Sequence, residues 1–119
     1  MVQKESSLKP IDNCGVWSMK IFQLYGGSFR RVSSVGNFVK ISIKKTRPDN
    51  LIPKKTKLKA IIVTVKKELG KSDGSYVKFC SNSAVLLKKR LTPKGSSLVG
   101  PASLNVRRKR FMSTFCGTI

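Results

Sequence analysis

Histidine is absent from the 119-residue sequence, and acidic residues are scarce, with only five Asp and Glu in total. Without histidine, the chain lacks the side chain that most often acts as a general base or as a metal ligand. The five carboxylates are dispersed and show no paired spacing, so no catalytic residue can be assigned. We therefore expect a protein that is not an enzyme and that needs no cofactor.

Cysteine is also rare, with Cys14, Cys80 and Cys116 widely spaced along the chain. No C-x-x-C pair is present, and this spacing disfavours a zinc site. Free thiols in a reducing compartment are the favoured interpretation. One carboxylate lies beside a thiol in Asp12-Asn13-Cys14-Gly15. Because no histidine can activate that thiol, we interpret this stretch as a turn.

Long apolar runs are missing as well, since none approaches the roughly 20 residues of a membrane-spanning helix. The first seven residues contain no apolar segment of a secretory signal, and no Arg-rich amphipathic presequence precedes the predicted domain. We expect a protein that works in the compartment where it is made. A binder of membrane surfaces or acidic polysaccharides would need a long amphipathic helix, and the one candidate helix is short.

Positive charge is what the sequence has in excess. Lys and Arg number 25, which gives a formal net charge of +20 and a pI near 10.6. A polyanion is the favoured partner because it would neutralise many of these charges at once, and a merely soluble basic surface is the weaker alternative. No acid follows Asp73, and residues 74–119 contain nine cations. This final third of the chain should depend on phosphates for its counter-charges.

Short strands separated by turn residues dominate the rest of the pattern. The clearest is 38–45, where Val39, Ile41 and Ile43 alternate with polar residues, and 60–65 is apolar on both faces. The other strands are predicted near residues 6–10, 17–25, 58–66, 76–79 and 84–87. Asp73-Gly74 should form a tight turn, and Gly26-Gly27 a flexible turn that presents two arginines.

This pattern predicts a mainly all-β fold, a small closed barrel of five or so strands. We place the barrel at about residues 1–90 and a C-terminal loop with short helices at about 91–119, within a single domain of residues 1–119. The only plausible helix follows Gly100-Pro101, because proline suits a first helical position, and extends from Ala102 to about Arg110.

The stretch from Ala60 to Leu86 resembles the signature of the universal large-subunit ribosomal protein fourteen family. The matching positions are Ala60, Ile61, Ile62, Val63, Asp73, Gly74, Phe79, Asn82, Val85 and Leu86. Further similarity covers Pro93, Gly95, Gly100, Pro101, Arg107, Phe111 and Met112. The chain departs from the family at Lys55-Thr56, which replaces a Gly-acidic turn. It also departs at Asn105 and Arg108, where acids are usual, and at Ser97, where an arginine is usual.

The resemblance implies a five-stranded OB-like barrel with a long basic hairpin loop and short C-terminal helices. It also implies a structural ribosomal protein that binds large-subunit rRNA and helps to form bridges to small-subunit rRNA. The implied protein neighbours are large-subunit ribosomal proteins three and nineteen, and no small-molecule substrate is implied. The charge excess and the loss of usual acids lead to the hypothesis of a mitochondrial ribosome, with plastid and bacterial ribosomes as alternatives.

Cations on strand faces and loops are the predicted rRNA contacts. They are Arg30, Arg31, Lys40, Lys44, Lys45, Arg47, Lys54, Lys55, Lys88, Lys89, Arg90 and Lys94, with Arg107, Arg108, Lys109 and Arg110 as a second patch. The alternative function is a free single-strand nucleic-acid chaperone, which needs a strip of exposed aromatic residues. Phe29, Phe38, Tyr76 and Phe79 could contribute to one, although we favour a core position for Phe38 and Phe79.

Overall fold

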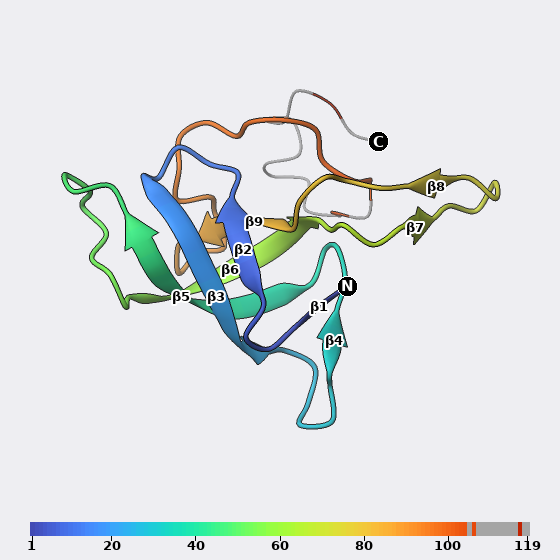
Figure 1. Cartoon of the computed structure of the whole chain (residues 1–119), viewed down its shortest axis with the longest axis horizontal. Helices are drawn as coiled ribbons and strands as arrows, with labels where there is room; N and C mark the ends of the chain where they lie inside the picture. Colours follow the sequence, from blue (N-terminus) through green and yellow to red (C-terminus); the bar gives the residue numbers. More distant parts are fainter. Residues whose placement is uncertain (105, 107–116, 118–119) are drawn as a thin grey trace.

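The structure is a computed structural model that describes residues 1–104, 106 and 117. Its strands are β1 (Val2–Gln3), β2 (Ser7–Pro10), β3 (Val16–Leu24), β4 (Val32–Ser33), β5 (Phe38–Thr46), β6 (Lys57–Thr64), β7 (Leu69–Gly70), β8 (Tyr76–Val77) and β9 (Ser83–Leu87). The five longer strands close into a barrel in the order β2-β3-β5-β6-β9, as Figure 1 shows. The predicted five-stranded barrel is confirmed.

Barrel closure depends on one parallel pairing. Successive strands around the barrel are antiparallel, and an odd number of alternating strands can close only if the first and last run in the same direction. Strands β2 and β9 meet in this way, with Lys9 opposite Ser83 and Pro10 opposite Ala84. Because the barrel is closed, each of the five strands pairs with a neighbour on both sides over at least part of its length. This protects a small sheet from pairing with other chains.

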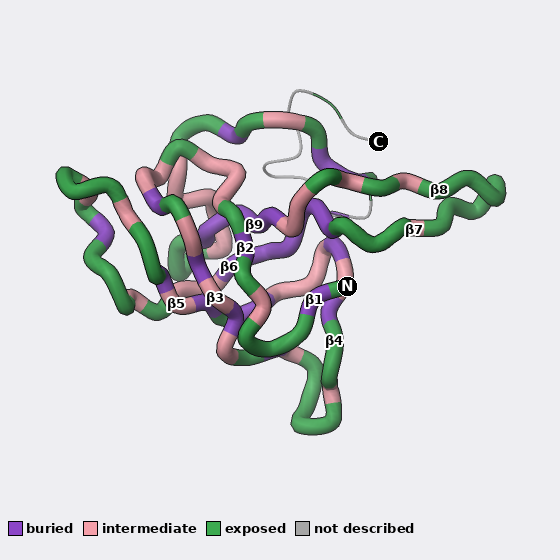
Figure 2. Tube along the Cα trace, in the orientation of Figure 1, coloured by how far each residue is buried: buried purple, intermediate pink, exposed green. Residues whose placement is uncertain are grey.

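Alternating apolar residues form the barrel core, as predicted for β5, where Val39, Ile41 and Ile43 are all fully buried. The predicted double-sided burial of residues 60–65 is also confirmed, since every residue from Ala60 to Val65 is buried (Figure 2). The segment before β5 runs beside this half of β6. The Gly36 amide donates to the Ile62 carbonyl at 2.8 Å, and the Ile62 amide donates to the Asn37 carbonyl at 3.1 Å.

Irregular pairing between β3 and β5 explains why the apolar pattern of β3 is not strictly alternating. The register shifts between Ile21 and Gln23 and twice between Val16 and Met19. Such bulges insert an unpaired residue and change which side chains face inward. As a result Met19, Ile21 and Leu24 are all buried although their spacing is uneven.

The hairpin of β7 and β8 extends away from the barrel, at the right of Figure 1. Its predicted turn at Asp73-Gly74 is confirmed, because Gly74 has a φ of 88° and Asp73 Oδ1 accepts from the Ser75 amide at 3.0 Å. The predicted strand over 76–79 is too long, since only Tyr76–Val77 pairs, and it pairs with β7. Phe79 is half-buried and lies outside any strand.

The base of this hairpin is fixed by a residue of the family signature. The side-chain Oδ1 of Asn82 accepts from the Lys66 amide at 2.8 Å, while its backbone carbonyl accepts from the Lys9 amide at 3.1 Å. Asn82 therefore connects β2, the end of β6 and the start of β9.

The segment after β9 returns along the barrel. The Lys94 amide donates to the Leu86 carbonyl at 2.8 Å, and Leu98 forms an isolated bridge with Asp12. Residues 102–104 are not helical. The remainder of the predicted helix, apart from Val106, lies outside the described residues, and so do Arg107, Arg108, Lys109 and Arg110. Over the part of the chain that the structure describes, no helix is long and apolar enough to cross a membrane.

Candidate RNA interface

The outer face of β3, β5 and β6 carries a row of lysines that the strand register aligns. Lys40 of β5 lies opposite Lys59 of β6, and Ser42 lies between Lys20 of β3 and Lys57 of β6. Residues directly opposite one another share a sheet face. Sequence analysis predicted only Lys40 of this row. The alternation of Lys57 and Lys59 with Leu58 and Ala60 was the signal that could have revealed its two β6 members.

Aromatic rings lie beneath these lysines. The Lys59 ammonium lies 4.8 Å from the ring centroids of both Tyr25 and Phe38, and the Lys57 ammonium lies 5.8 Å from that of Phe22. Both distances are within the range of a cation–π attraction. The lysines are thereby held above the sheet, and they cover ring faces that a nucleobase would otherwise need for stacking.

Phe38 differs from the prediction in its position. It packs against the core residues, but it is only half-buried and shares the strand face of Lys40 rather than that of Val39. Its ring therefore contributes to the outer surface beneath Lys59.

The exposed aromatic side chains lie on three separate parts of the fold. Trp17 in β3, Phe29 in the β3–β4 loop and Tyr76 in β8 are 57%, 96% and 71% exposed. Strand β3, the loop after it and the β7–β8 hairpin point in different directions in Figure 1. Among the described residues these three side chains form no continuous strip on adjacent strands, which is the feature that the single-strand chaperone alternative requires.

A groove lined by five lysines lies where the start of β6 meets the end of β9. Its volume is about 560 Å³, and we call it the lysine groove. Its lining residues are Lys57, Leu58, Lys59, Leu87, Lys88, Lys89, Leu91 and Lys94, with no carboxylate among them. The groove thus joins three predicted contacts, Lys88, Lys89 and Lys94, to the two β6 lysines that the sequence prediction omitted. Arg90 is exposed but does not line it.

A tight loop holds the β9 lysines in place. The Lys88 amide donates to the Thr92 carbonyl at 2.8 Å, and the Leu91 amide donates to the Lys88 carbonyl at 2.9 Å. Leu91 takes a left-handed conformation, with φ of 61°. These bonds turn the chain so that Lys94 returns to the groove opened by Lys88 and Lys89.

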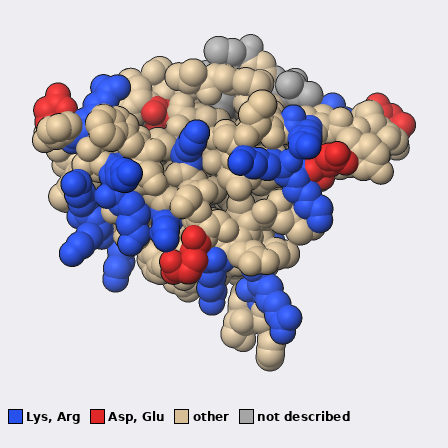
Figure 3. Space-filling model, in the orientation of Figure 1, with Lys and Arg blue, Asp and Glu red and all other residues tan. Residues whose placement is uncertain are grey.

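The end of β5 and the β5–β6 loop provide the next group of predicted cations. Lys44, Lys45, Arg47, Lys54 and Lys55 are all exposed. In Figure 3, Lys and Arg atoms gather over the side of the molecule where β5 and this loop lie, and few acidic atoms interrupt them.

Lys55 lies in the turn where the resemblance implies a Gly-acidic pair, and its φ of 66° is in the left-handed region that favours glycine. The Lys55 amide donates to the Ile43 carbonyl at 2.9 Å, and the Ile43 amide donates to the Thr56 carbonyl at 3.2 Å. The turn therefore holds a non-glycine residue at the cost of backbone strain, and Lys55 adds one cation to the loop.

Arg30 and Arg31 lie at the opposite end of β5 from this loop, because the β3–β4 loop follows Leu24, which pairs with Val39 at the start of β5. Arg31 is exposed, whereas Arg30 is half-buried and donates from Nε to the Val32 carbonyl at 3.1 Å. The turn needs Gly26, whose φ is 119° and where a Cβ would lie 2.7 Å from Arg30 Cδ. Arg30 therefore has a structural role in this loop.

The turn before β3 is hydrogen-bonded to the segment after β9 through the side chain of Asn13. Asn13 Oδ1 accepts from the amides of Ser96 at 2.9 Å and Ser97 at 3.2 Å, and its Nδ2 donates to Ser96 Oγ at 2.8 Å. Gly95 permits this approach, because a Cβ there would lie only 2.6 Å from Asp12 Cβ.

Cys14, in the same turn, is not a nucleophile. Its Sγ donates to Asp12 Oδ1 at 2.9 Å, and burial, followed by this hydrogen bond, raises the pKa of the thiol to about 12. The thiol therefore stays protonated near neutral pH. Across the described residues no cluster of His, Cys, Asp or Glu could hold a metal ion.

Comparison with known proteins shows the family of the chain. Residues 1–116 match the sequence model of the family described as ribosomal protein L14p/L23e. The chain belongs to this family. The large ribosomal subunit protein uL14m of Tetrahymena pyriformis is 68% identical to it over 119 residues, which cover the whole of both chains. The resemblance found in the sequence is thus confirmed, and the family signature corresponds to β6, the β7–β8 hairpin and β9.

Proposed function

We propose that this protein is a structural component of the large ribosomal subunit that binds large-subunit rRNA through the lysine groove and the adjoining lysine row. Family membership supports the ribosomal role, and the groove supports the site, because five lysines converge there without a carboxylate. The proposed role is structural, and we assign it neither catalysis nor a cofactor.

The mechanism is electrostatic and steric. A lysine that contacts a phosphate releases condensed counterions, so each contact increases the magnitude of the salt slope of binding by about 0.7 to 0.9. Folded rRNA presents phosphates in the geometry of A-form helices and their junctions, and recognition is then mainly of backbone shape. Lysines held above Phe22, Tyr25 and Phe38 are partly ordered before binding, which reduces the entropy lost when the phosphates arrive.

A second part of the proposal concerns bridges to small-subunit rRNA. Arg31 and the β5–β6 loop lie at opposite ends of β5. Two separated cationic ends would let one protein contact two RNA surfaces at once. The resemblance favours this role and also favours large-subunit proteins three and nineteen as neighbours.

The mitochondrial location rests on the Tetrahymena relative, whose name marks it as a large ribosomal subunit protein of the mitochondrial type. The 68% identity between the two sequences over their full lengths supports a mitochondrial ribosome for this protein in preference to plastid or bacterial ribosomes.

Release of the protein from ribosomes by salt tests the proposal. Ribosomes from purified mitochondria would be centrifuged through sucrose gradients of increasing salt, and the protein would be followed by mass spectrometry. We expect it to stay with the large subunit at salt concentrations that remove loosely bound basic proteins. Recovery in free fractions at low salt would instead favour the single-strand chaperone.

A charge-matched pair of variants tests the site. Lys88→Gln/Lys89→Gln removes two cations from the lysine groove, whereas Lys71→Gln/Lys78→Gln removes two exposed cations from the β7–β8 hairpin region. If the groove binds rRNA, the first variant leaves the subunit at lower salt than the second. Equal release of both variants would show that only total charge matters.

A further inference from the structure

Trp17 is the only tryptophan of the chain, and its indole is 57% exposed on the outside of the barrel. The register of β3 against β5 passes from Val16 directly to Ser18, so Trp17 is the unpaired residue of a bulge. Bulges commonly redirect one side chain away from the regular alternation. Such a large apolar group held in solvent needs an explanation, because burying it would be favourable.

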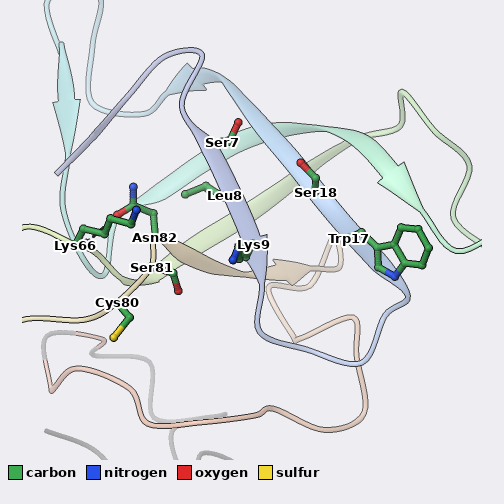
Figure 4. A pocket seen from close by; sticks show the side chains of 9 residues that line it. All are labelled: Ser7, Leu8, Lys9, Trp17, Ser18, Lys66, Cys80, Ser81 and Asn82. Carbon is green, nitrogen blue, oxygen red and sulfur yellow. Dashed lines mark hydrogen bonds between the residues drawn. The ribbon is translucent and has the colours of Figure 1, made fainter.

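Trp17 forms one end of a groove of about 250 Å³ that crosses β2. In Figure 4 the indole lies at one end, Lys9 lies between, and Lys66 and Asn82 lie at the other end. Ser7, Ser18 and Ser81 add hydroxyl groups to the lining, which contains two lysines and no carboxylate. We call this the Trp17 groove. It is smaller than the roughly 300–1,000 Å³ of a typical site for a drug-sized ligand, which suits a narrow strand better.

The far end of the groove is built to donate hydrogen bonds. Asn82 Oδ1 already accepts from the Lys66 amide at 2.8 Å, which fixes the orientation of the side-chain amide. None of the residues that the structure describes accepts a hydrogen bond from Nδ2 of Asn82. Next to the Lys66 ammonium, these donors form a site that favours an anionic oxygen acceptor.

We propose that the Trp17 groove binds a single-stranded segment of RNA, with one base stacked on the indole of Trp17 and the phosphate backbone crossing β2 toward Lys66 and Asn82. An aromatic platform beside cations is the combination by which proteins bind unpaired nucleotides. The large positive charge of the chain favours RNA over an apolar protein segment as the occupant. This proposal rests on the proposed function, since it assigns an additional rRNA contact outside the lysine groove.

The fluorescence of the single tryptophan tests the proposal at the site itself. The full chain would be titrated with fluorophore-labelled penta-adenylate, and anisotropy of the label and indole emission would be recorded together. We expect both signals to change with the same midpoint, because a stacked base quenches the indole. Trp17→Ala should weaken penta-adenylate binding about 5- to 150-fold, the effect of losing one stacked base.

Two further variants separate stacking from charge. Lys66→Gln should retain quenching but reduce the salt slope by about 0.7, the contribution of one single-strand phosphate contact. Tyr76→Ala removes an exposed aromatic outside the groove and should leave the quenching midpoint unchanged.

The outcomes distinguish the two proposals. Binding seen by anisotropy without indole quenching would overturn the Trp17 site and leave the proposed function intact, as would equal quenching by a blunt RNA duplex. Absence of binding by either signal would overturn the Trp17 site, whereas the proposed function is tested separately by the release of the protein from ribosomes by salt. In purified large subunits, ultraviolet crosslinking should recover the Trp17 peptide bearing a nucleotide. Recovery of that peptide attached to another protein would instead assign the groove to a protein partner.

Discussion

Lys55 adds a positive charge to the β5–β6 loop but holds a non-glycine residue in a strained left-handed conformation. A non-glycine residue in the left-handed region costs roughly 1–2 kcal/mol, whereas glycine adds about 0.5–1 kcal/mol of unfolded-state entropy. We therefore expect Lys55→Gly to raise the free energy of unfolding by about 0.5–1 kcal/mol. Urea denaturation of the free chain measures this value.

The neighbouring residue provides the control for this prediction. Lys54 is also exposed but is not among the residues with positive φ. Lys54→Gly removes the same charge without relieving strain, and should lower the free energy of unfolding by about 0.5–1 kcal/mol. If Lys55→Gly also lowers the free energy of unfolding, backbone strain does not determine the stability effect at Lys55.

Cys14 should react more slowly than Cys80, because burial and its bond to Asp12 raise the pKa of Cys14 to about 12 from an ordinary 9.0. Its folded-state pKa is raised, so its contribution to stability is complete below pH 9 and is lost as the pH rises toward 12. Iodoacetamide at pH 8 should modify exposed Cys80 first, as mass spectrometry would detect. A Cys116→Ser background removes the third thiol, and equal rates at Cys14 and Cys80 would contradict the prediction.

At the scale of elements, the turn before β3 and the segment after β9 depend on one asparagine. Asn13→Ala removes two bonds from backbone amides and one to a hydroxyl. Because the site is exposed, we expect a loss of about 1–2 kcal/mol of stability. Hydrogen exchange should show faster exchange of the Ser96 and Ser97 amides, while those of β5 remain protected.

Asn13→Asp is the matched control, because its carboxylate still accepts from the amides of Ser96 and Ser97. We expect these amides to stay protected in the control. Loss of protection in both variants would mean that the turn, rather than these bonds, was disturbed.

Features set by local sequence could be predicted, whereas features set by the pairing of distant strands could not. Val39, Ile41 and Ile43 were predictable because alternation is a local pattern, and the Asp73-Gly74 turn was predictable because its chemistry is local. The outward position of Lys59 was predictable from the same alternation, but its alignment with Lys40 was not, because that depends on the register between two strands. Trp17 was missed for a similar reason, since a bulge against β5 sets its exposure.

At the scale of the whole molecule, a charge of +20 should make the free chain sensitive to salt. The Debye length is about 30 Å at 0.01 M, comparable with the diameter of a small domain, so all surface cations repel one another. It falls to about 10 Å at 0.1 M, where distant repulsions are screened. We expect the melting temperature to rise over this range by on the order of 5 °C, which corresponds to about 1 kcal/mol.

Sulfate and a charge-reversed variant separate screening from other effects of salt. Sulfate at the same ionic strength should stabilise the chain more than chloride, because it also favours burial of surface. Lys71→Glu/Lys78→Glu lowers the formal charge from +20 to +16 at exposed positions, and its melting temperature should depend less on chloride. A melting temperature that falls with chloride would show that favourable ion pairs, rather than repulsion, dominate the free chain. In that case the fold would not need rRNA to relieve charge repulsion, and rRNA would stabilise the protein only through the free energy of binding.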